Sequence, residues 1–318
     1  MTRVALLQGG HSLERQVSLK SGARAEDALE RLGHEVVTID VGPDLVERLG
    51  AARPDAAFVA MHGRDGEDGT VQELLELLGV PYTGSGPFAC LRCWDKVLTK
   101  HALVEAGIPT PAFYAFSQTA FRELGAAHAL PAIEERLDFP IVLKPASQGS
   151  ALGIKFALTA ADVPKGLMTA FSYDSKVLLE RHVAGRDLAV SILDGPGGPE
   201  ALPVVEAIAH PDDDFYDFVA RYEIGRTTFA CPAPMPPALS ERAQELALQA
   251  YRLLGCHGFA RVDLMLDAVS DELFVIEVNA IPGLTETSLL PQAADAAGID
   301  FDSLIARMLD SALVRAAG

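Results

Sequence analysis

The chain has 318 residues, 49% of them hydrophobic and 22% charged, a composition typical of a soluble globular protein. Its 26 Lys and Arg residues against 44 Asp and Glu give a formal net charge of −18, which disfavours nucleic acids and anionic membrane surfaces as partners. No apolar stretch reaches membrane-spanning length and the N-terminus has no signal-peptide pattern, so we expect a cytoplasmic protein.

The first ninety residues alternate strand and helix signals, and a chain of this length suits two or three domains that share a cleft. Apolar runs at residues 4–7, 35–40 and 56–61 predict strands, whereas residues 17–32 and 71–78 have helical periodicity. This rhythm indicates a small parallel sheet with its functional loops at the carboxyl ends of the strands. A complete G-x-G-x-x-G is absent, so a dinucleotide site is not indicated.

The next part of the chain predicts a hairpin with a glycine- and serine-rich tip. A helix at residues 95–106 ends at Gly107, a candidate domain boundary. Strands at residues 139–143 and 153–158 then flank the stretch ASQGSALG. Such a tip can donate backbone N–H groups to phosphates, and the adjacent Lys144 favours this interpretation over an ordinary mobile hairpin.

The second half of the chain is predicted to be mainly strands with one long amphipathic helix at residues 239–254. The stretch at residues 210–237 is irregular, and a loop this long is usually functional or disordered. The predicted strands are residues 176–180, 188–193, 202–209, 259–266 and 273–279.

Two short motifs are assigned structural roles. Cys90 and Cys93 form a C-x-x-C just before a helical pattern, but no second pair or nearby histidine completes a zinc site, so we expect reduced, packed thiols. The run DGEDG at residues 65–69 resembles part of a calcium loop without its ligand spacing, and it predicts a turn or a helix start.

The last predicted strand ends unusually, in a carboxylate and an amide. Glu277 and Asn279 are two residues apart, so on a strand they point to the same face. Asp263 lies on the preceding strand, with Arg261 on its face, and antiparallel pairing would bring the two acids together. Two carboxylates and an amide oxygen suit Mg²⁺ or Mn²⁺, and the alternative is a strand end that frays into a turn.

Six stretches spread over nearly the whole chain carry a combined signature: LLQGGHSLERQVSLKSG, HGRDGEDGTVQELLELLGVPYTGSG, KP…GSALG, FYDFVARY, GFARVDLMLD and VIEVNAIPGLTETSLLP. They resemble the D-alanine–D-alanine ligases of the ATP-grasp superfamily. The resemblance implies an α/β (α+β) ATP-grasp fold with an N-terminal Rossmann-like parallel-sheet domain. It implies three parts: a substrate domain at residues 1–94, a central subdomain at 95–180, and a C-terminal subdomain with the metal and acceptor sites at 181–318.

The activity implied by this resemblance is a two-step ligation. The carboxylate of one D-alanine attacks the γ-phosphate of ATP, and the amine of a second D-alanine then displaces phosphate from the resulting acyl phosphate. The first step is needed because a carboxylate is a poor acyl donor until one oxygen becomes a good leaving group. Asp263, Glu277 and Asn279 match the family's ligands for Mg²⁺ or Mn²⁺, with two ions expected.

The resemblance also implies the residues that contact ATP. Lys96 and Lys144 match the lysines that bind its phosphates. Arg221 stands in the loop where a lysine is usual. The residues matched to the base and the sugar are Glu180, His182 and Val183 for adenine and Asp187 for ribose.

For the first D-alanine, the resemblance matches Glu14 to the acid that holds the ammonium group, with Val17 and His62 near the same pocket. Ser150 and Tyr222 complete a hydrogen-bonded triad with Glu14, and the tyrosine favours an amine acceptor.

For the second step, Arg261 and the N–H of Gly283 match the groups that stabilise the oxyanion of the tetrahedral intermediate. Ser288 and Leu289 match the place where the carboxylate of the second D-alanine is received.

Four positions depart from the family pattern without removing a metal ligand: Arg221 for lysine, Asp187 for glutamate, Ala151 for serine and Ala280 for threonine. The implied product supplies peptidoglycan precursor, and homodimers are usual in the family. Two alternatives stay open: a paralogous ATP-grasp ligase with another amino acid or a specialised pathway, and a non-catalytic nucleotide-binding regulator.

Overall fold

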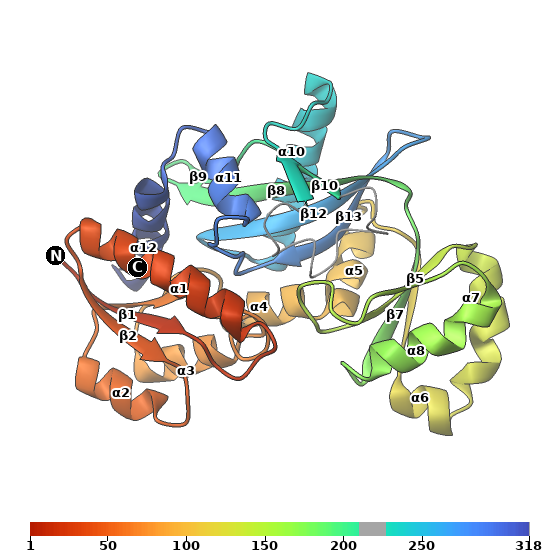
Figure 1. Cartoon of the computed structure of the whole chain (residues 1–318), viewed down its shortest axis with the longest axis horizontal. Helices are drawn as coiled ribbons and strands as arrows, with labels where there is room; N and C mark the ends of the chain where they lie inside the picture. The colour runs from red at the N-terminus through yellow and green to blue at the C-terminus, as the bar shows by residue number, and fades with distance from the viewer. Residues whose placement is uncertain (210–226, 318) are drawn as a thin grey trace.

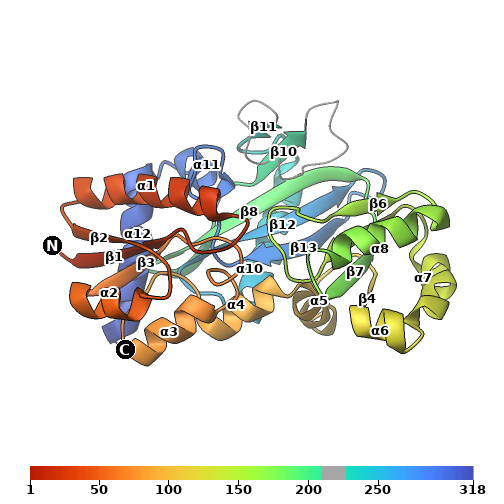
Figure 2. The same cartoon turned by 60° about the horizontal axis from the view of Figure 1, so that its bottom comes forward.

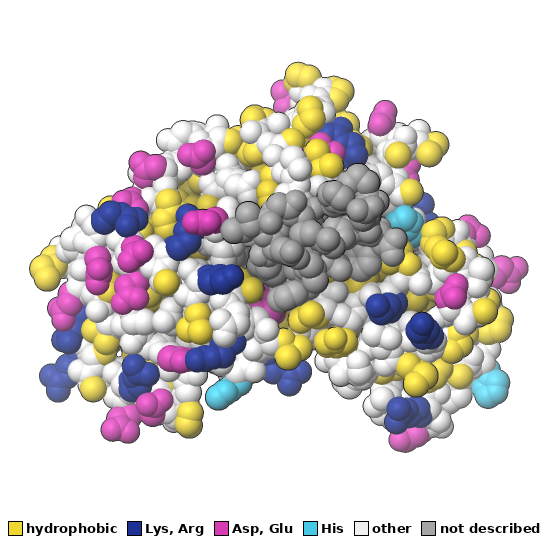
Figure 3. Space-filling view, in the orientation of Figure 1, with side chains coloured by type: hydrophobic (Ala, Val, Ile, Leu, Met, Phe, Trp, Pro, Cys, Tyr) yellow, Lys and Arg dark blue, Asp and Glu magenta, His cyan; other side chains and the backbone are white. Residues whose placement is uncertain are grey.

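The computed structural model describes residues 1–209 and 227–317, and these form three sheets with helices packed around them (Figure 1). The predicted Arg221 and Tyr222 lie outside the described residues. Within the described part of the chain, no helix is long and apolar enough to cross a membrane. Basic and acidic side chains are interspersed over the face drawn in Figure 3.

The N-terminal sheet is parallel, with strand order β2-β1-β3, as the alternating pattern predicted. Successive β1 side chains point to opposite faces, so Leu6 packs toward α1 and α12 whereas Leu7 packs toward α2 and α3 (Figure 2). The elements are β1 (Arg3–Gln8), α1 (Arg15–Arg31), β2 (Glu35–Asp40), α2 (Leu45–Ala52), β3 (Ala56–Val59) and α3 (Thr70–Leu78).

The second sheet is antiparallel, with order β11-β10-β8-β12-β13 and β9 paired to β8. Alternation along β8 sends Leu188, Val190 and Ile192 toward α10, and Ala189 and Leu193 toward α11 and α12. The strands are β8 (Gly185–Gly195), β9 (Gly198–Ala201), β10 (Val205–Ala209), β11 (Thr227–Ala230), β12 (Phe259–Asp267) and β13 (Leu273–Asn279). The helices are α4 (Pro87–Trp94), α5 (Lys96–Glu105), α10 (Pro237–Leu254), α11 (Leu289–Ala296) and α12 (Phe301–Ala317).

The third sheet, at the right in Figure 1, is antiparallel with order β4-β7-β5-β6 and holds the predicted hairpin as β5 and β6. Its core of aliphatic residues lies between the sheet and helices α7 and α8. The elements are β4 (Phe113–Ser117), α6 (Gln118–Glu123), η1 (Ala126–Ala129), α7 (Leu130–Leu137), β5 (Ile141–Pro145), β6 (Lys155–Ala157), η2 (Ala160–Asp162), α8 (Val163–Phe171) and β7 (Lys176–Arg181).

Two predictions of local structure were wrong. The strand expected at residues 202–209 begins only at Val205, because Pro203 has no N–H for a ladder. The stretch expected to be irregular contains β11. Cys90 and Cys93 precede the predicted helix, α5, as expected, and they lie in a helix that was not predicted, α4. All four cysteines are free, and Cys93 Sγ is 3.6 Å from Cys256 Sγ.

Candidate active site

Strand β12 presents one apolar face and one charged face. Val262 and Leu264 pack in the core cluster under α10, so Arg261 and Asp263 point to the opposite face. Asp263 lies directly across from Glu277 of β13, as the sequence predicted. Residues directly opposite in an antiparallel pair share a face, so the two carboxylates are neighbours.

A β-bulge in β13 places the side chains of Glu277 and Asn279 on the charged face of the sheet. Asp263 pairs with Glu277 but the next residue of β12 pairs with Val275, so Ile276 is an extra residue in β13. Strict alternation would have placed Glu277 on the same face as Val275, which is packed in the core under α10. After the bulge it is Val278 that packs in that core, so Glu277 and Asn279 share the opposite face with Asp263.

Cations already contact both carboxylates. Arg261 donates from Nε and from its terminal nitrogen to the two oxygens of Asp263, at 2.6 and 2.8 Å. Lys96 Nζ lies 3.2 Å from Glu277 Oε2 and donates to the carbonyl oxygen of Gln148 at 2.8 Å. The pair of acids therefore forms a place that attracts positive charge, next to the tip of the β5–β6 hairpin.

The donor chemistry of this place fits a divalent cation. Two carboxylates and an amide oxygen are hard ligands of the kind that Mg²⁺ and Mn²⁺ prefer. Each carboxylate has lone pairs beyond its present contacts, and Asn279 Oδ1 accepts one hydrogen bond, from the N–H of Ile281 at 2.9 Å. Within the described residues no three His, Cys, Asp or Glu side chains gather as a metal site, and Asn279 is the further oxygen donor beside the two carboxylates.

A polar cavity lies beside these acids and joins segments from four parts of the chain. Six of its lining residues come from the first 96 residues of the chain, three belong to the hairpin tip, and the other six come from β12, β13 and the turn after β13. The residues lining this polar cavity that the sequence had singled out are Glu14, His62, Lys96, Ser150, Arg261, Glu277, Asn279 and Gly283. Glu67, Trp94, Gln148 and Gly149 also line it.

Glu14 and the hairpin tip meet across the polar cavity. Ser150 donates a hydrogen bond from its hydroxyl to Glu14 Oε1, and both side chains are buried. A Cβ on Gly149 would lie 2.8 Å from Glu14 Oε1, so a larger residue there would displace the Glu14 carboxylate. Ser150 and Ala151 have φ of 54° and 57°, a left-handed conformation that costs about 1–3 kcal/mol and persists where the surroundings fix it.

Burial and a second acid raise the pKa of the Glu14 carboxyl to about 7. The second acid is Glu67, which is also buried, while Ser150, His62 and Lys96 oppose the shift. Glu67 Oε1 lies 3.4 Å from His62 Nδ1, and the other ring nitrogen of His62 lies 3.0 Å from the Ser21 hydroxyl. The cavity thus holds an excess of carboxyl groups, which an ammonium group would relieve.

The turn after β13 is tied to α1. The N–H of Leu284 donates to Ser21 Oγ at 3.1 Å, and Ser288 Oγ accepts from the N–H of Thr285 at 3.0 Å. A Cβ on Gly283 would lie 2.6 Å from Ser288 Oγ, so Gly283 and Ser288 are close neighbours. Val17 is buried in the first turn of α1, with its N–H donating to the carbonyl oxygen of Glu14 at 2.9 Å.

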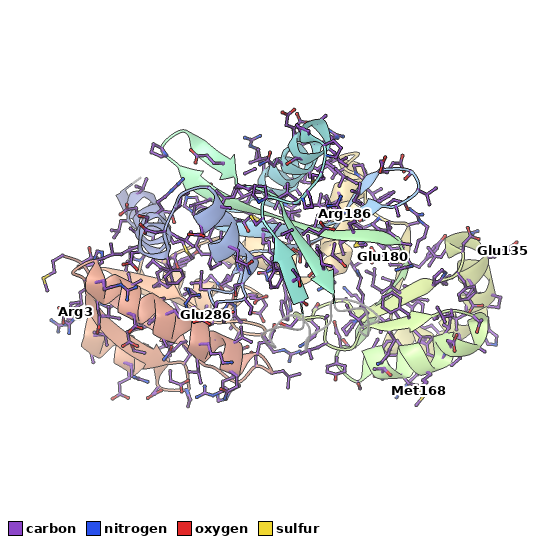
Figure 4. All side chains as sticks on the ribbon, turned by 45° about the horizontal axis from the view of Figure 1, so that its top comes forward. Arg3, Glu135, Met168, Glu180, Arg186 and Glu286 are labelled. Carbon is purple, nitrogen blue, oxygen red and sulfur yellow. The ribbon has the colours of Figure 1, made fainter. Side chains whose placement is uncertain are left out.

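A second cavity, which we call the interlobe cleft, lies between the third sheet and the second sheet. Glu180 lies where these two parts of the molecule meet (Figure 4). Burial lowers the pKa of His182, whose ring packs edge-on against Phe156 at 5.2 Å. The sequence-predicted residues that line the interlobe cleft are Lys144, Glu180, His182, Val183, Asp187, Asp263, Glu277 and Leu289. Glu277 therefore borders both cavities, and Leu289 lies at the interlobe cleft.

The Glu180 carboxylate is bound by two lysines, Lys100 from α5 and Lys144 from β5. Burial raises the pKa of Glu180, but the two lysines outweigh burial and hold it below its ordinary value. Lys100 was not predicted as a site residue, although its spacing of one helical turn from Lys96 places both on one side of α5.

Comparison with known proteins decides the family. The D-ala D-ala ligase C-terminus model matches residues 102–310 and the corresponding N-terminus model matches residues 44–85. The chain belongs to the D-alanine–D-alanine ligase family. It is 43% identical to a D-alanine–D-alanine ligase of Syntrophotalea carbinolica over 98% of this chain and 97% of the relative. It is 42% identical to that of Moorella thermoacetica, over 98% of this chain and 99% of the relative.

Solved structures of the family share the fold. The crystal structure of D-alanine–D-alanine ligase from Bacillus anthracis complexed with ATP matches with a TM-score of 0.83 and 33% identity, covering 100% of this chain and 99% of that one. The ligase from Coxiella burnetii matches with a TM-score of 0.80 and 26% identity, covering 99% and 96%. The expected ATP-grasp fold with an N-terminal parallel-sheet domain is confirmed.

Two residues of the polar cavity, Glu67 and Gln148, were not predicted as site residues. Glu67 belongs to the DGEDG run, to which the pattern assigned only a turn or a helix start, yet its side chain lines the polar cavity. The signal was present, since DGEDG lies within one of the stretches that carry the family resemblance. Gln148 contributes through its carbonyl oxygen, and a backbone contact leaves no signal in residue type.

Proposed function

We propose that this chain ligates two D-alanines with ATP, forming D-alanyl-D-alanine. The observation that carries the proposal is that Glu277 lines both cavities. The polar cavity suits an amino acid and the interlobe cleft suits a nucleotide, so the two ligands would meet at this carboxylate. The family membership gives the substrates, because the relatives are D-alanine–D-alanine ligases and one solved relative is a complex with ATP.

In the first step, Glu14 holds the ammonium group of the donor D-alanine, with His62 and Val17 beside it and Ser150 and Tyr222 fixing the carboxylate of Glu14. An oxygen of the D-alanine carboxylate attacks the γ-phosphorus of ATP, the bond from that phosphorus to the bridging oxygen breaks, and ADP leaves. The products are D-alanyl phosphate and ADP. Holding the two reactants in line contributes much of the rate, since little covalent chemistry falls to the protein.

Positive groups of the chain neutralise the phosphates during this step. We assign Lys96, Lys144 and Arg221 to the phosphate groups. Adenine is assigned to Glu180, His182 and Val183, and ribose to Asp187. The planar fork of Arg221 keeps the charge of the usual lysine with a different geometry.

In the second step, the amine of the acceptor D-alanine attacks the acyl carbon, and phosphate leaves as the amine loses its proton. Arg261 and the N–H of Gly283 stabilise the oxyanion, and loss of one such donor typically costs ~10²–10³ in rate. Ser288 and Leu289 receive the carboxylate of the acceptor. The burial of Ser288 in a network with Thr285 supports a fixed orientation of this end.

Asp263, Glu277 and Asn279 would hold Mg²⁺ or Mn²⁺, with two ions expected. A bound divalent ion would supply neutralisation of phosphate charge, worth several kcal/mol in general. The proposal also includes a cytoplasmic location, a homodimer and a role in peptidoglycan precursor supply. It includes the division of the chain at residues 1–94, 95–180 and 181–318.

The test is D-alanine-dependent release of ADP and phosphate from ATP with Mg²⁺, with the product identified by mass spectrometry. We expect D-alanyl-D-alanine as the main product from a panel of D- and L-amino acids. A main product from another amino acid would replace this proposal by the paralogous ligase. Binding of ATP without any D-alanine-dependent release would replace it by the non-catalytic regulator.

A further inference from the structure

Lys100 is a lysine with no exposure to solvent. Its side chain is 0% exposed, and it lies in the middle of α5 among groups from the third sheet. An ammonium group in such a place is costly unless charged and hydrogen-bonding partners surround it. Its position therefore requires a reason beyond packing.

Its partners include Glu180, which lines the interlobe cleft. Lys100 binds the carboxylate of Glu180, donates to Thr110 Oγ1 at 2.6 Å, and lies 5.3 Å from the ring centroid of Phe113. Burial lowers the pKa of Lys100 to about 8 against the opposing pull of Glu180, so the ammonium form still predominates near neutral pH. The pair with Glu180 is thus an ion pair.

The carboxylate of Glu180 divides between two lysines. Oε1 faces Lys100 and Oε2 faces Lys144, and both lysines are nearly or fully buried. Lys144 and Glu180 line the interlobe cleft, whereas Lys100 is closed off from solvent behind them. Lys100 therefore does not touch a ligand in the cleft, and Glu180 is the group that links it to the cleft.

Charge balance gives the effect of Lys100 a direction. Within this cluster, two ammonium groups and one carboxylate leave a net charge of +1, on a cleft that Asp187, Asp263 and Glu277 also line. Without Lys100 the group would be neutral, Glu180 would hold Lys144 as its one cation in this cluster, and its carboxylate would repel an incoming phosphate. With Lys100 in place, Lys144 can turn to a phosphate while Glu180 keeps a cation.

We propose that Lys100 is a positioning residue of the nucleotide site: it neutralises Glu180 from behind, so that Lys144 is free to bind the phosphates of ATP. The proposal rests on the proposed function and assigns a role to a residue that does not touch either substrate. A purely structural role would make the Lys100–Glu180 pair a tie between α5 and β7, without a preference for phosphate-bearing ligands.

The experiment measures binding of a non-hydrolysable ATP analogue and of adenosine by calorimetry to the full-length chain. Lys100→Met keeps a long buried side chain and removes the charge. We expect it to weaken the analogue by ~10–100-fold, the loss typical of a charged hydrogen bond, and adenosine by no more than ~3-fold. Lys165→Met, on the exposed surface of α8, is the matched control and should leave both affinities unchanged.

The double variant Lys100→Met/Glu180→Gln is compared with Glu180→Gln, because Glu180 itself is assigned to the nucleotide site. We expect the two variants to bind the analogue within ~3-fold of each other, because without the Glu180 carboxylate Lys100 has no acid to neutralise. An unchanged affinity in Lys100→Met overturns the proposal, as does an equal loss for adenosine. If Lys100→Met does not fold, this pair decides: a double variant that binds the analogue more than ~10-fold more weakly than Glu180→Gln overturns the proposal.

Failure of the proposed function has a different signature. A wild-type chain that binds neither ligand and makes no D-alanyl-D-alanine would remove the basis of both proposals. A wild type that binds the analogue and makes the dipeptide, with Lys100→Met binding the analogue equally well, overturns the role of Lys100 alone.

Discussion

The polar cavity and the interlobe cleft each contain a buried glutamate, and the two carboxyls are tuned in opposite directions. Glu14 is buried beside another acid, Glu67, and its pKa rises to about 7. Glu180 is buried between Lys100 and Lys144, and its pKa falls below its ordinary value. Burial opposes ionisation in both places, so the neighbours decide the result.

The difference indicates what each cavity can bind. The polar cavity has more carboxyl groups than its cations neutralise around Glu14, so a substrate ammonium group completes it. In the interlobe cleft, Glu180 is shared by two lysines, so one of them, Lys144, can turn to a phosphate while Glu180 keeps a cation.

The largest effect is expected at Glu277, which borders both cavities. Glu277→Gln removes one carboxylate from the proposed metal set and the partner of Lys96. A loss of several kcal/mol lowers kcat by ~10²–10³-fold. Steady-state kinetics with ATP, Mg²⁺ and D-alanine measure it. Glu272→Gln, on the exposed turn of the same hairpin, is the control; near-normal turnover of Glu277→Gln with an intact fold would contradict the metal assignment.

A smaller effect is expected at Glu14, on the kinetic constants for D-alanine and not on those for ATP. Glu14→Gln removes the negative charge that pairs with the donor ammonium, so kcat/KM for D-alanine should fall by ~10–10²-fold. The KM for ATP should stay near the wild-type value, because the interlobe cleft is untouched. Initial rates with each substrate varied in turn measure the two constants. Glu30→Gln, exposed on α1, is the control, and an equal loss for ATP would mean that the two cavities are not independent.

The fold was largely predictable because its signals are local. The parallel sheet follows from alternating strand and helix patterns, and the pairing of Asp263 with Glu277 follows from two adjacent strands joined by a short turn. Strand β4 gave no such signal, because all five of its residues are half-buried at the edge of a sheet and its pattern does not alternate.

The sequence singled out residues that the structure brings together, but it did not predict their geometry. Motif resemblance pointed to Glu277 and Asn279, yet strict alternation along β13 would have placed them with Val275, in the core. The bulge at Ile276 depends on pairing with β12, which is a tertiary property. The partnership of Lys100 with Glu180 likewise joins α5 to β7, and no local pattern encodes it.

The pH dependence of the two cavities should differ. Glu14 must be ionised to hold an ammonium group, so kcat/KM for D-alanine should fall as the pH drops below about 7. Glu67→Gln removes a cause of the raised pKa and should move this inflection to lower pH, leaving the KM for ATP unchanged. Rates from about pH 5.5 to 8.5, a range centred on the raised pKa of about 7 and well above the ordinary titration of a carboxyl group, measure the shift. Glu73→Gln, exposed on α3, is the control; an unmoved inflection would remove Glu67 as a cause.

The smallest effect is expected at Ala280, where the family commonly has threonine. The side chain is 2% exposed and packs in the core cluster under α10, at the border of the polar cavity. Ala280→Thr adds a hydroxyl there, and without a hydrogen-bond partner this costs about 1–3 kcal/mol of stability. Thermal unfolding measures the cost, and Ala280→Val separates added volume from added polarity.

The substitution changes no charged group around Glu14 or Glu180, so the KM for D-alanine and the KM for ATP should both stay near the wild-type values in Ala280→Thr. If Ala280→Thr lowers Tm more than Ala280→Val does, the added hydroxyl has no hydrogen-bond partner, and the core of this chain favours an apolar side chain at position 280. If instead Ala280→Thr raises Tm, the hydroxyl has formed a hydrogen bond at the edge of the polar cavity. Position 280 then belongs to the lining of the cavity as much as to the core.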